Sequence, residues 1–188
     1  MTEGRAKSGT AGEVMRLALV LGGIALVISA LLALVNSVTA PIIAENEVAA
    51  RRELFSALFP QAQDFVELPE DPTNALLREG YRVAGEGGEP LGFAVIVVPR
   101  GYGGTMELAV GFDLEARVLG IDFLSMAETP GIGTQIEEES YRAQYVGLDR
   151  FDTVQAISGA TVSSTAVREG AQAAAEAVQT WLADESAA

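Results

Sequence analysis

The sequence predicts an α+β protein in which a single N-terminal transmembrane helix precedes a domain with a mainly antiparallel sheet and packed helices. Three observations carry this prediction. Residues 17–35 contain no charged side chain. Strand-like apolar segments at 91–98, 106–112 and 117–125 are separated by Gly-rich or polar turns, which is typical of an antiparallel meander. From 163 to 182, apolar residues recur at helical spacing.

The uncharged segment is long enough to cross a bilayer. As a helix, it would span roughly 28 Å, about the thickness of the hydrocarbon core. A cleaved signal peptide is the alternative, but its apolar region would be shorter and a small-x-small cleavage site would follow. We therefore expect a retained transmembrane helix at 17–38. The nearest basic residues precede it, which favours a cytoplasmic N-terminus at 1–16.

The rest of the chain is expected to lie outside the cytoplasm. Pro41 is expected to end or kink the membrane helix. An apolar stripe within 45–58 then indicates a stalk helix, which we place at 39–62. Residues 63–184 are predicted to form the extracytoplasmic domain, and 185–188 a frayed tail.

Composition excludes several kinds of function. With 12 Lys and Arg against 26 Asp and Glu, the net charge is −14, which argues against nucleic-acid binding. The chain has no Cys and no His. Iron–sulfur clusters, His- or Cys-ligated haem, His-based nucleophile triads and Cys/His zinc sites are therefore excluded, and no metal site is expected. If the protein carries electrons, an organic cofactor is the expected carrier.

The most informative segment is 158–161 (Ser-Gly-Ala-Thr), which lies between a strand-like run at 153–157 and the last helix. Free amide groups and the positive dipole end at a helix start favour a phosphate. The two small residues leave room for a bulky group to approach the backbone. We interpret the segment as a place where a phosphate is held by, or bonded to, Thr161. The alternative is an ordinary helix N-cap made by Thr161, Ser163 or Ser164.

Two loops are further candidates for ligand binding. Residues 101–104 (Gly-Tyr-Gly-Gly) lack the Gly-Lys-Ser/Thr of a P-loop and the spacing of a dinucleotide fingerprint, so a plain hairpin connection is the alternative. Residues 128–133 (Glu-Thr-Pro-Gly-Ile-Gly) contain a Pro-Gly pair typical of a tight turn. Glu128 and Thr129 stand at the entrance of this turn, where the polar edge of a ligand could bind.

These features occur together and in order: a single span ending near 36–41, the loop at 101–104, the loop at 128–133, and the tetrapeptide followed by Val162, Ser163 and Ser164. In this combination the chain resembles RnfG, the covalent-FMN protein of the Rnf electron transport complex. It is similar also to NqrC, the related flavin protein of the sodium-translocating NADH:quinone reductase. The resemblance covers roughly residues 17–182, and the tetrapeptide is its most specific part.

The resemblance implies an electron-carrying flavoprotein component of a membrane-bound, ion-translocating ferredoxin:NAD oxidoreductase, without independent catalysis. It implies one FMN per chain, attached by a flavin transferase through a phosphoester to Thr161. Implied partners are membrane lipid and other subunits of the complex, including a second flavin-carrying membrane subunit. The implied location is the cytoplasmic (inner) membrane, single-pass, with the C-terminal domain outside. The expected FMN contacts are Ser158, Gly159, Ala160, Val162, Ser163, Ser164, Glu128, Thr129, Pro130, Gly131, Gly101 and Tyr102.

Two positions depart from the pattern of the resembled family. Gln155 stands where many relatives have Asp, and Met126 where many have His. Two alternative functions also stay open. One is that of the quinone-reductase protein NqrC, and the other is a non-redox, membrane-anchored binding or assembly module that uses the two loops to contact a partner.

Overall fold

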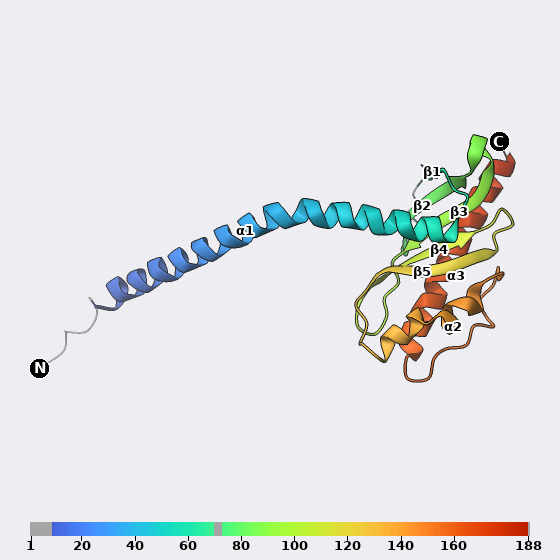
Figure 1. Ribbon diagram of the computed structural model, residues 1–188. Coiled ribbons are helices and arrows are strands. Elements are labelled where there is room, and N and C mark those ends of the chain that lie inside the picture. Colours follow the sequence, from blue (N-terminus) through green and yellow to red (C-terminus); the bar gives the residue numbers. More distant parts are fainter. Residues whose placement is uncertain (1–8, 70–72, 188) are drawn as a thin grey trace, which may run out of the picture. The chain divides into compact units, whose positions relative to one another are not determined.

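The computed structural model describes residues 9–69 and 73–187 (Figure 1). Parts of the predicted N-terminal segment, of the loop near 69–74 and of the predicted tail lie outside these described residues. The chain divides into two units, Met1–Ala49 and Ala50–Ala188. The first is helical, and the second contains the sheet and the remaining helices.

A single helix, α1 (Gly9–Leu58), replaces the two helices expected from the sequence. Pro41 lies inside it, so the predicted stalk at 45–58 continues the membrane helix without a break. A proline removes only one backbone donor, and the long helix on both sides retains its other hydrogen bonds. Its most apolar window has a mean hydropathy of 2.8 and is fully exposed. Among the described residues, α1 is the one helix that is long and apolar enough to cross a membrane.

The second unit contains five strands in the order β1-β2-β3-β4-β5, and every neighbouring pair is antiparallel. The predicted α+β class with an antiparallel meander is therefore confirmed. The strands are β1 (Asp64–Glu67), β2 (Leu77–Ala84), β3 (Pro90–Val97), β4 (Met106–Phe112) and β5 (Val118–Met126). The helices are α2 (Glu139–Arg142) and α3 (Thr161–Ala187), with 3₁₀ turns η1 (Glu86–Gly88), η2 (Gly133–Glu137) and η3 (Ala143–Tyr145).

Strand β3 is apolar on both sides because both faces of the sheet are covered. Phe93, Val95 and Val97 belong to one hydrophobic core, and Ala94 and Ile96 belong to a second core on the opposite face. All five side chains are completely buried. This explains why the sequence of β3 shows a continuous apolar run instead of the alternation of a half-exposed strand.

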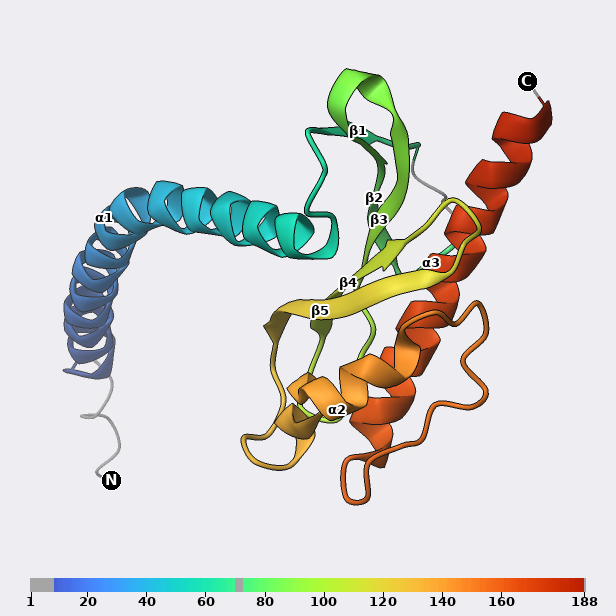
Figure 2. The same cartoon turned by 45° about the vertical axis from the view of Figure 1, so that its right-hand side comes forward.

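Helix α3 covers one face of the sheet at close range (Figure 2). A methyl group added to Gly170 would lie 2.9 Å from Cγ of Pro99, and one added to Gly80 would lie 2.1 Å from the ring of Trp181. The Trp181 ring also stacks on Phe93 with centroids 6.3 Å apart. Glycines on both sides of the interface thus allow the close approach, and Trp181 packs in the core as the sequence predicts.

The last turns of α1 cover the opposite face. Phe55 and Phe59 are buried in the second core. A methyl group at Gly120 would lie 2.8 Å from a methyl of Leu58, and one at Gly111 would lie 3.2 Å from the Phe59 ring. Burial of two phenylalanines contributes about 3–6 kcal/mol, so this segment is part of the folded domain.

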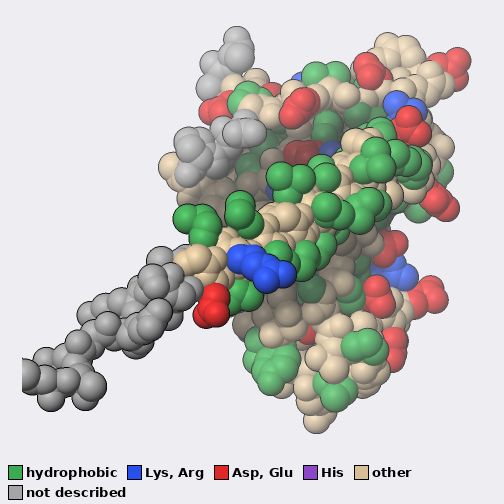
Figure 3. All heavy atoms as spheres, turned by 90° about the vertical axis from the view of Figure 1, so that its left-hand side faces the viewer, with side chains coloured by type: hydrophobic (Ala, Val, Ile, Leu, Met, Phe, Trp, Pro, Cys, Tyr) green, Lys and Arg blue, Asp and Glu red, His purple; other side chains and the backbone are tan. Residues whose placement is uncertain are grey.

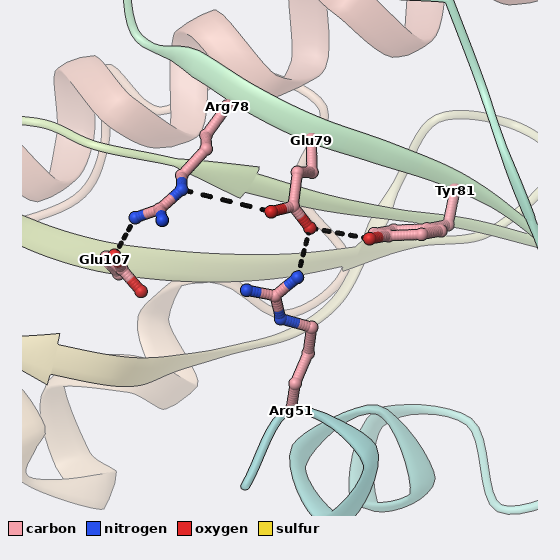
Figure 4. A network of polar contacts seen from close by, with 5 residues as sticks. All are labelled: Arg51, Arg78, Glu79, Tyr81 and Glu107. Carbon is pink, nitrogen blue, oxygen red and sulfur yellow. Dashed lines mark hydrogen bonds and ion pairs between the residues drawn. The ribbon is translucent and has the colours of Figure 1, made fainter. Parts of the chain in front are cut away.

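Polar contacts accompany this apolar packing (Figure 4). Arg51 of α1 pairs with Glu79 of β2, and the phenol of Tyr81 donates to the same carboxylate at 2.6 Å. Arg78 contacts Glu79 at 3.9 Å and pairs with Glu107 of β4. Burial, together with Glu79, raises the pKa of Tyr81. Because the charged groups are partly exposed, the network stabilises the docking less than the buried rings do.

Three local expectations differ from the structure. The strand-like run at 153–157 is irregular, because its amides bond to side chains: Gln155 N–H to Gln144 Oε1 at 2.9 Å and Ile157 N–H to Ser164 Oγ at 3.1 Å. Strand β1 was not predicted from the sequence, since it is short and mostly exposed. The predicted tail at 185–188 is helical as far as Ala187, where Glu185 pairs with Arg82.

Two buried phenols lie beneath the start of α3. Tyr141 of α2 and Tyr145 of η3 share an O···O hydrogen bond of 2.9 Å, and their rings meet edge to face. The Tyr141 hydroxyl also donates to the carbonyl oxygen of Ser164 at 3.1 Å. Burial raises the pKa of both phenols.

We predict that these phenols make the domain sensitive to alkali. Above about pH 10 the unfolded chain loses phenolic protons that the folded domain keeps, so stability falls by about 1.4 kcal/mol per pH unit for each group. The stability is fully present below that pH and is lost as pH rises towards the raised pKa of the folded state. Replacing both residues, Tyr141→Phe with Tyr145→Phe, should flatten this fall.

Urea unfolding of the full chain in detergent, followed by circular dichroism between pH 8 and 12, measures the effect. The double variant should begin about 1 kcal/mol less stable, because a buried hydrogen bond is lost, and should then converge on the wild type. Parallel curves for the two proteins would contradict the prediction.

Candidate functional site

The tetrapeptide forms a tight turn that leads directly into α3. Ala160 N–H donates to the carbonyl of Ile157 at 3.0 Å, and Gly159 has φ +86°. A positive φ at the third residue of such a turn favours glycine. A methyl group at Gly159 would meet nothing within 4 Å, so the backbone conformation, and not the space, requires glycine there. Thr161 follows as the first residue of α3 and is exposed.

Ser164 holds this turn in place. It is 2% exposed, and its Oγ accepts the N–H of Ile157, while its own N–H donates to Ala160 at 2.9 Å. In a helix, the amides ahead of the first such bond have no intrahelical acceptor. The amides of residues 161–163 therefore remain available at the positive end of the helix dipole, which is a suitable place for an anion.

A second tight turn lies in the loop after β5. Ile132 N–H donates to the carbonyl of Thr129 at 3.2 Å, and Gly131 has φ +76°. This is the turn that the Pro-Gly pair predicts. Thr134 Oγ1 accepts the N–H of Gly131 at 2.9 Å, and Gln135 donates to its carbonyl at 2.8 Å. These bonds fix the loop against η2.

The carboxylate of Glu128 joins the two glycine-containing loops. Gly103 N–H donates to Glu128 Oε2 at 3.2 Å. A methyl group at Gly101 would lie 1.9 Å from Oε1, and one at Gly133 would lie 2.4 Å from Oε2. Both glycines therefore make space for the carboxylate, which is 8% exposed. Residues 101–104 also form the β3–β4 connection, so the hairpin interpretation and the ligand-site interpretation describe the same loop.

The turns and loops surround one cavity of about 500 Å³. This volume lies in the range typical of small-molecule sites. Five of the expected contacts do not line it, although they belong to the same loops and turns: Gly101, Pro130, Gly131, Ser158 and Ser164. Two lining residues were missing from the expected contacts, and both follow Gly131 in the same loop. The complete lining is Tyr102, Glu128, Thr129, Ile132, Gly133, Gly159, Ala160, Thr161, Val162 and Ser163.

The cavity combines an apolar rim with a polar end. Tyr102, Ile132 and Val162 are 78%, 52% and 54% exposed, although large apolar side chains of a domain are usually more buried. The Thr161 hydroxyl and the amides of the α3 N-terminus form the polar end. Such a cavity suits a molecule with a flat apolar part and an anionic group. No cluster of metal-ligating side chains occurs in the described parts of the chain.

Fold and site together define a membrane-anchored, small-molecule-binding α+β domain. Residues 101–176 match the FMN-binding domain family, and residues 11–58 match the RnfG N-terminal region. The RnfG-type component of the ion-translocating oxidoreductase complex of Shewanella piezotolerans is 30% identical over 155 residues, covering 78% of this chain and 68% of that protein. The chain therefore belongs to the RnfG family of ion-translocating oxidoreductase complexes, which its sequence resembles.

Two further comparisons extend along most of the chain. The corresponding component of the proton-translocating ferredoxin:NAD(+) oxidoreductase complex of Clostridium ljungdahlii is 28% identical over 162 residues, which are 80% of this chain and 84% of that protein. The crystal structure of Shewanella oneidensis NqrC superposes with a TM-score of 0.51 at 17% identity, covering 69% of this chain and 74% of that one. At this identity the second comparison shows a shared fold.

We predict that the packing of the two loops tolerates no side chain at Gly103. A methyl group there would lie 2.1 Å from the carbonyl oxygen of Ala127 and 3.0 Å from Cα of Glu128. Both atoms belong to the backbone and cannot rotate away. Gly103→Ala should therefore lower the free energy of unfolding by about 1–3 kcal/mol.

Urea unfolding of the full chain in detergent tests this. Gly12→Ala in α1 is the control, because a methyl group at Gly12 meets nothing within 4 Å. Equal stability of Gly103→Ala and the wild type would show that the loops are packed more loosely than the structure indicates.

Proposed function

We propose that the protein is the electron-carrying flavin component of a membrane-bound, ion-translocating ferredoxin:NAD oxidoreductase, with one FMN attached through a phosphoester to Thr161. The observation that carries the proposal is the position of Thr161, an exposed hydroxyl in the wall of the cavity at the first residue of α3. An enzyme that attaches a cofactor must reach its acceptor, and an exposed hydroxyl satisfies that condition. The FMN-binding domain match covers the same residue.

The cavity residues suit each part of FMN. The amides at the start of α3 would hold the phosphate, which the helix dipole stabilises by up to about 1 kcal/mol. Tyr102, Ile132 and Val162 would cover the faces of the apolar ring system, and Thr129 and Glu128 would lie near its polar edge. When bound, FMN supplies the electron-transfer chemistry, and the protein supplies position and electrostatics.

The position of the protein in the cell follows from α1. We propose that α1 anchors the chain in the cytoplasmic membrane, with residues 1–16 inside and the FMN-binding domain at 63–184 outside. The distribution of basic residues before the span supports this orientation. The relatives named as components of complexes support other membrane subunits as partners, including one that carries a second flavin, and a flavin transferase acts during maturation.

We predict that Thr161→Ala abolishes covalent flavin and leaves the fold intact, because an exposed side chain contributes little to stability. Thr161→Ser should keep part of the modification, since a hydroxyl remains. Thr180→Ala is the matched control: Thr180 is an exposed threonine of the same helix, and its hydroxyl donates to the carbonyl of Glu176 at 3.0 Å. It should be modified like the wild type.

Intact-protein mass spectrometry with peptide mapping measures the outcome, on full-length chain co-expressed with a flavin transferase and denatured beforehand. The wild type should gain the mass of one FMN less one water, on the peptide that contains Thr161. An unmodified Thr161, beside a transferase that modifies a known substrate, would return the tetrapeptide to a helix cap. The non-redox binding module would then be the better interpretation.

A further inference from the structure

We infer that Glu128 provides an uncompensated negative charge in the wall of the cavity and thereby lowers the reduction potential of the cofactor. The inference rests on the proposed attachment of FMN at Thr161. It concerns a different residue, which acts through space and forms no bond to the cofactor. Three features of Glu128 support it: its burial, its few hydrogen bonds and its isolation from cations.

The fold buries this carboxylate by leaving out side chains around it. Glu128 is 8% exposed, and Gly101 and Gly133 would place methyl groups 1.9 and 2.4 Å from its two oxygens. Burying a carboxylate is unfavourable unless it is paired. A chain that places glycines on two separate loops to enclose one therefore retains it for a reason other than stability.

The carboxylate has little to balance its charge. Its one hydrogen bond in the described parts of the chain comes from Gly103 N–H, at 3.2 Å from Oε2. Glu128 Oε1 is buried without a hydrogen-bond partner. No Lys or Arg of residues 9–69 and 73–187 forms an ion pair with Glu128, and it is the single charged residue among those that line the cavity.

A charge in this position opposes reduction of a neighbouring flavin. In the test reaction, a reductant delivers two electrons and water supplies one proton, so the ring system gains one net negative charge. A fixed carboxylate in a partly water-excluded cavity repels that charge far more strongly than it would in bulk water. The reduced form is therefore destabilised relative to the oxidised form, and the potential is lower than it would be without Glu128.

The other carboxylates act differently, although the net charge is −14. Acidic side chains are spread around the surface of the domain instead of gathering at one place (Figure 3). Interactions of such exposed charges are screened within about 3 Å at 1 M salt, whereas buried charges are screened much less. Salt therefore separates the contribution of Glu128 from that of the surface.

The experiment is a redox titration of the full-length, FMN-loaded chain in detergent, with dithionite as reductant and a reference dye, at fixed pH. Mass spectrometry first establishes that each variant carries FMN on Thr161. Glu128→Gln removes the charge and keeps the shape of the side chain. Glu128→Met is the second uncharged variant, in case the amide disturbs folding. Glu137→Gln is the control, because Glu137 is an exposed carboxylate in the adjoining η2 turn.

In Glu128→Gln and Glu128→Met, the ratio of reduced to oxidised flavin at a fixed potential should rise about tenfold, which is about 30 mV for a two-electron couple. The rise should persist in 1 M KCl, and Glu137→Gln should show no such persistent shift. An unchanged or lowered potential, or a rise that vanishes in salt, would overturn the inference. If the wild type carries no FMN on Thr161, the proposed function itself fails, and the mass spectrum shows this before any titration.

Discussion

The close packing of α3 against the sheet is the constraint on which the rest of the structure depends. Gly170 and Gly80 allow the helix to approach until Pro99 and the Trp181 ring fill the contact. Cores are packed too densely to shift gradually, so this contact fixes the axial position of α3. The first residue of α3, Thr161, consequently has a fixed location relative to the loops that follow β3 and β5. A cavity built from loops alone would lack such a reference point.

The site is assembled around two glycine-dependent turns of the same kind, one ending at Ile132 and one ending at Ala160. Each has a left-handed glycine at its third position, which lets the chain reverse within a few residues. The first turn carries Glu128 and Thr129 to the cavity wall, and the second presents the acceptor hydroxyl on a helix terminus. Buried side-chain bonds, above all those of Ser164, hold the second turn. Rigid backbone and an exposed hydroxyl are thus combined, as covalent attachment of a cofactor requires.

Several of these features were accessible from the sequence. Runs such as 91–98 and 106–112 predict strands because the apolar pattern and the turn residues are local signals. The Pro-Gly turn at 128–133 and the helix start at 161 follow from the same kind of signal. The strand prediction at 153–157 is wrong because its β-branched residues pack in the core without a neighbouring strand to pair with. Strand formation requires that partner, which lies elsewhere in the chain, so no local pattern reports its absence.

The sequence by itself determined the fold class, the uncharged span, the absence of Cys and His chemistry, and the helix terminus at Thr161, because composition, periodicity and short motifs are properties of neighbouring residues. Tertiary structure decided which of the candidate residues share a cavity. It placed Ile132 and Gly133 in the lining, turned Ser164 inward, and enclosed Glu128 between Gly101 and Gly133. Burial and isolation of a charge depend on groups that are distant in sequence and adjacent only after folding, which is why the sequence could indicate Glu128 but could not reveal its environment.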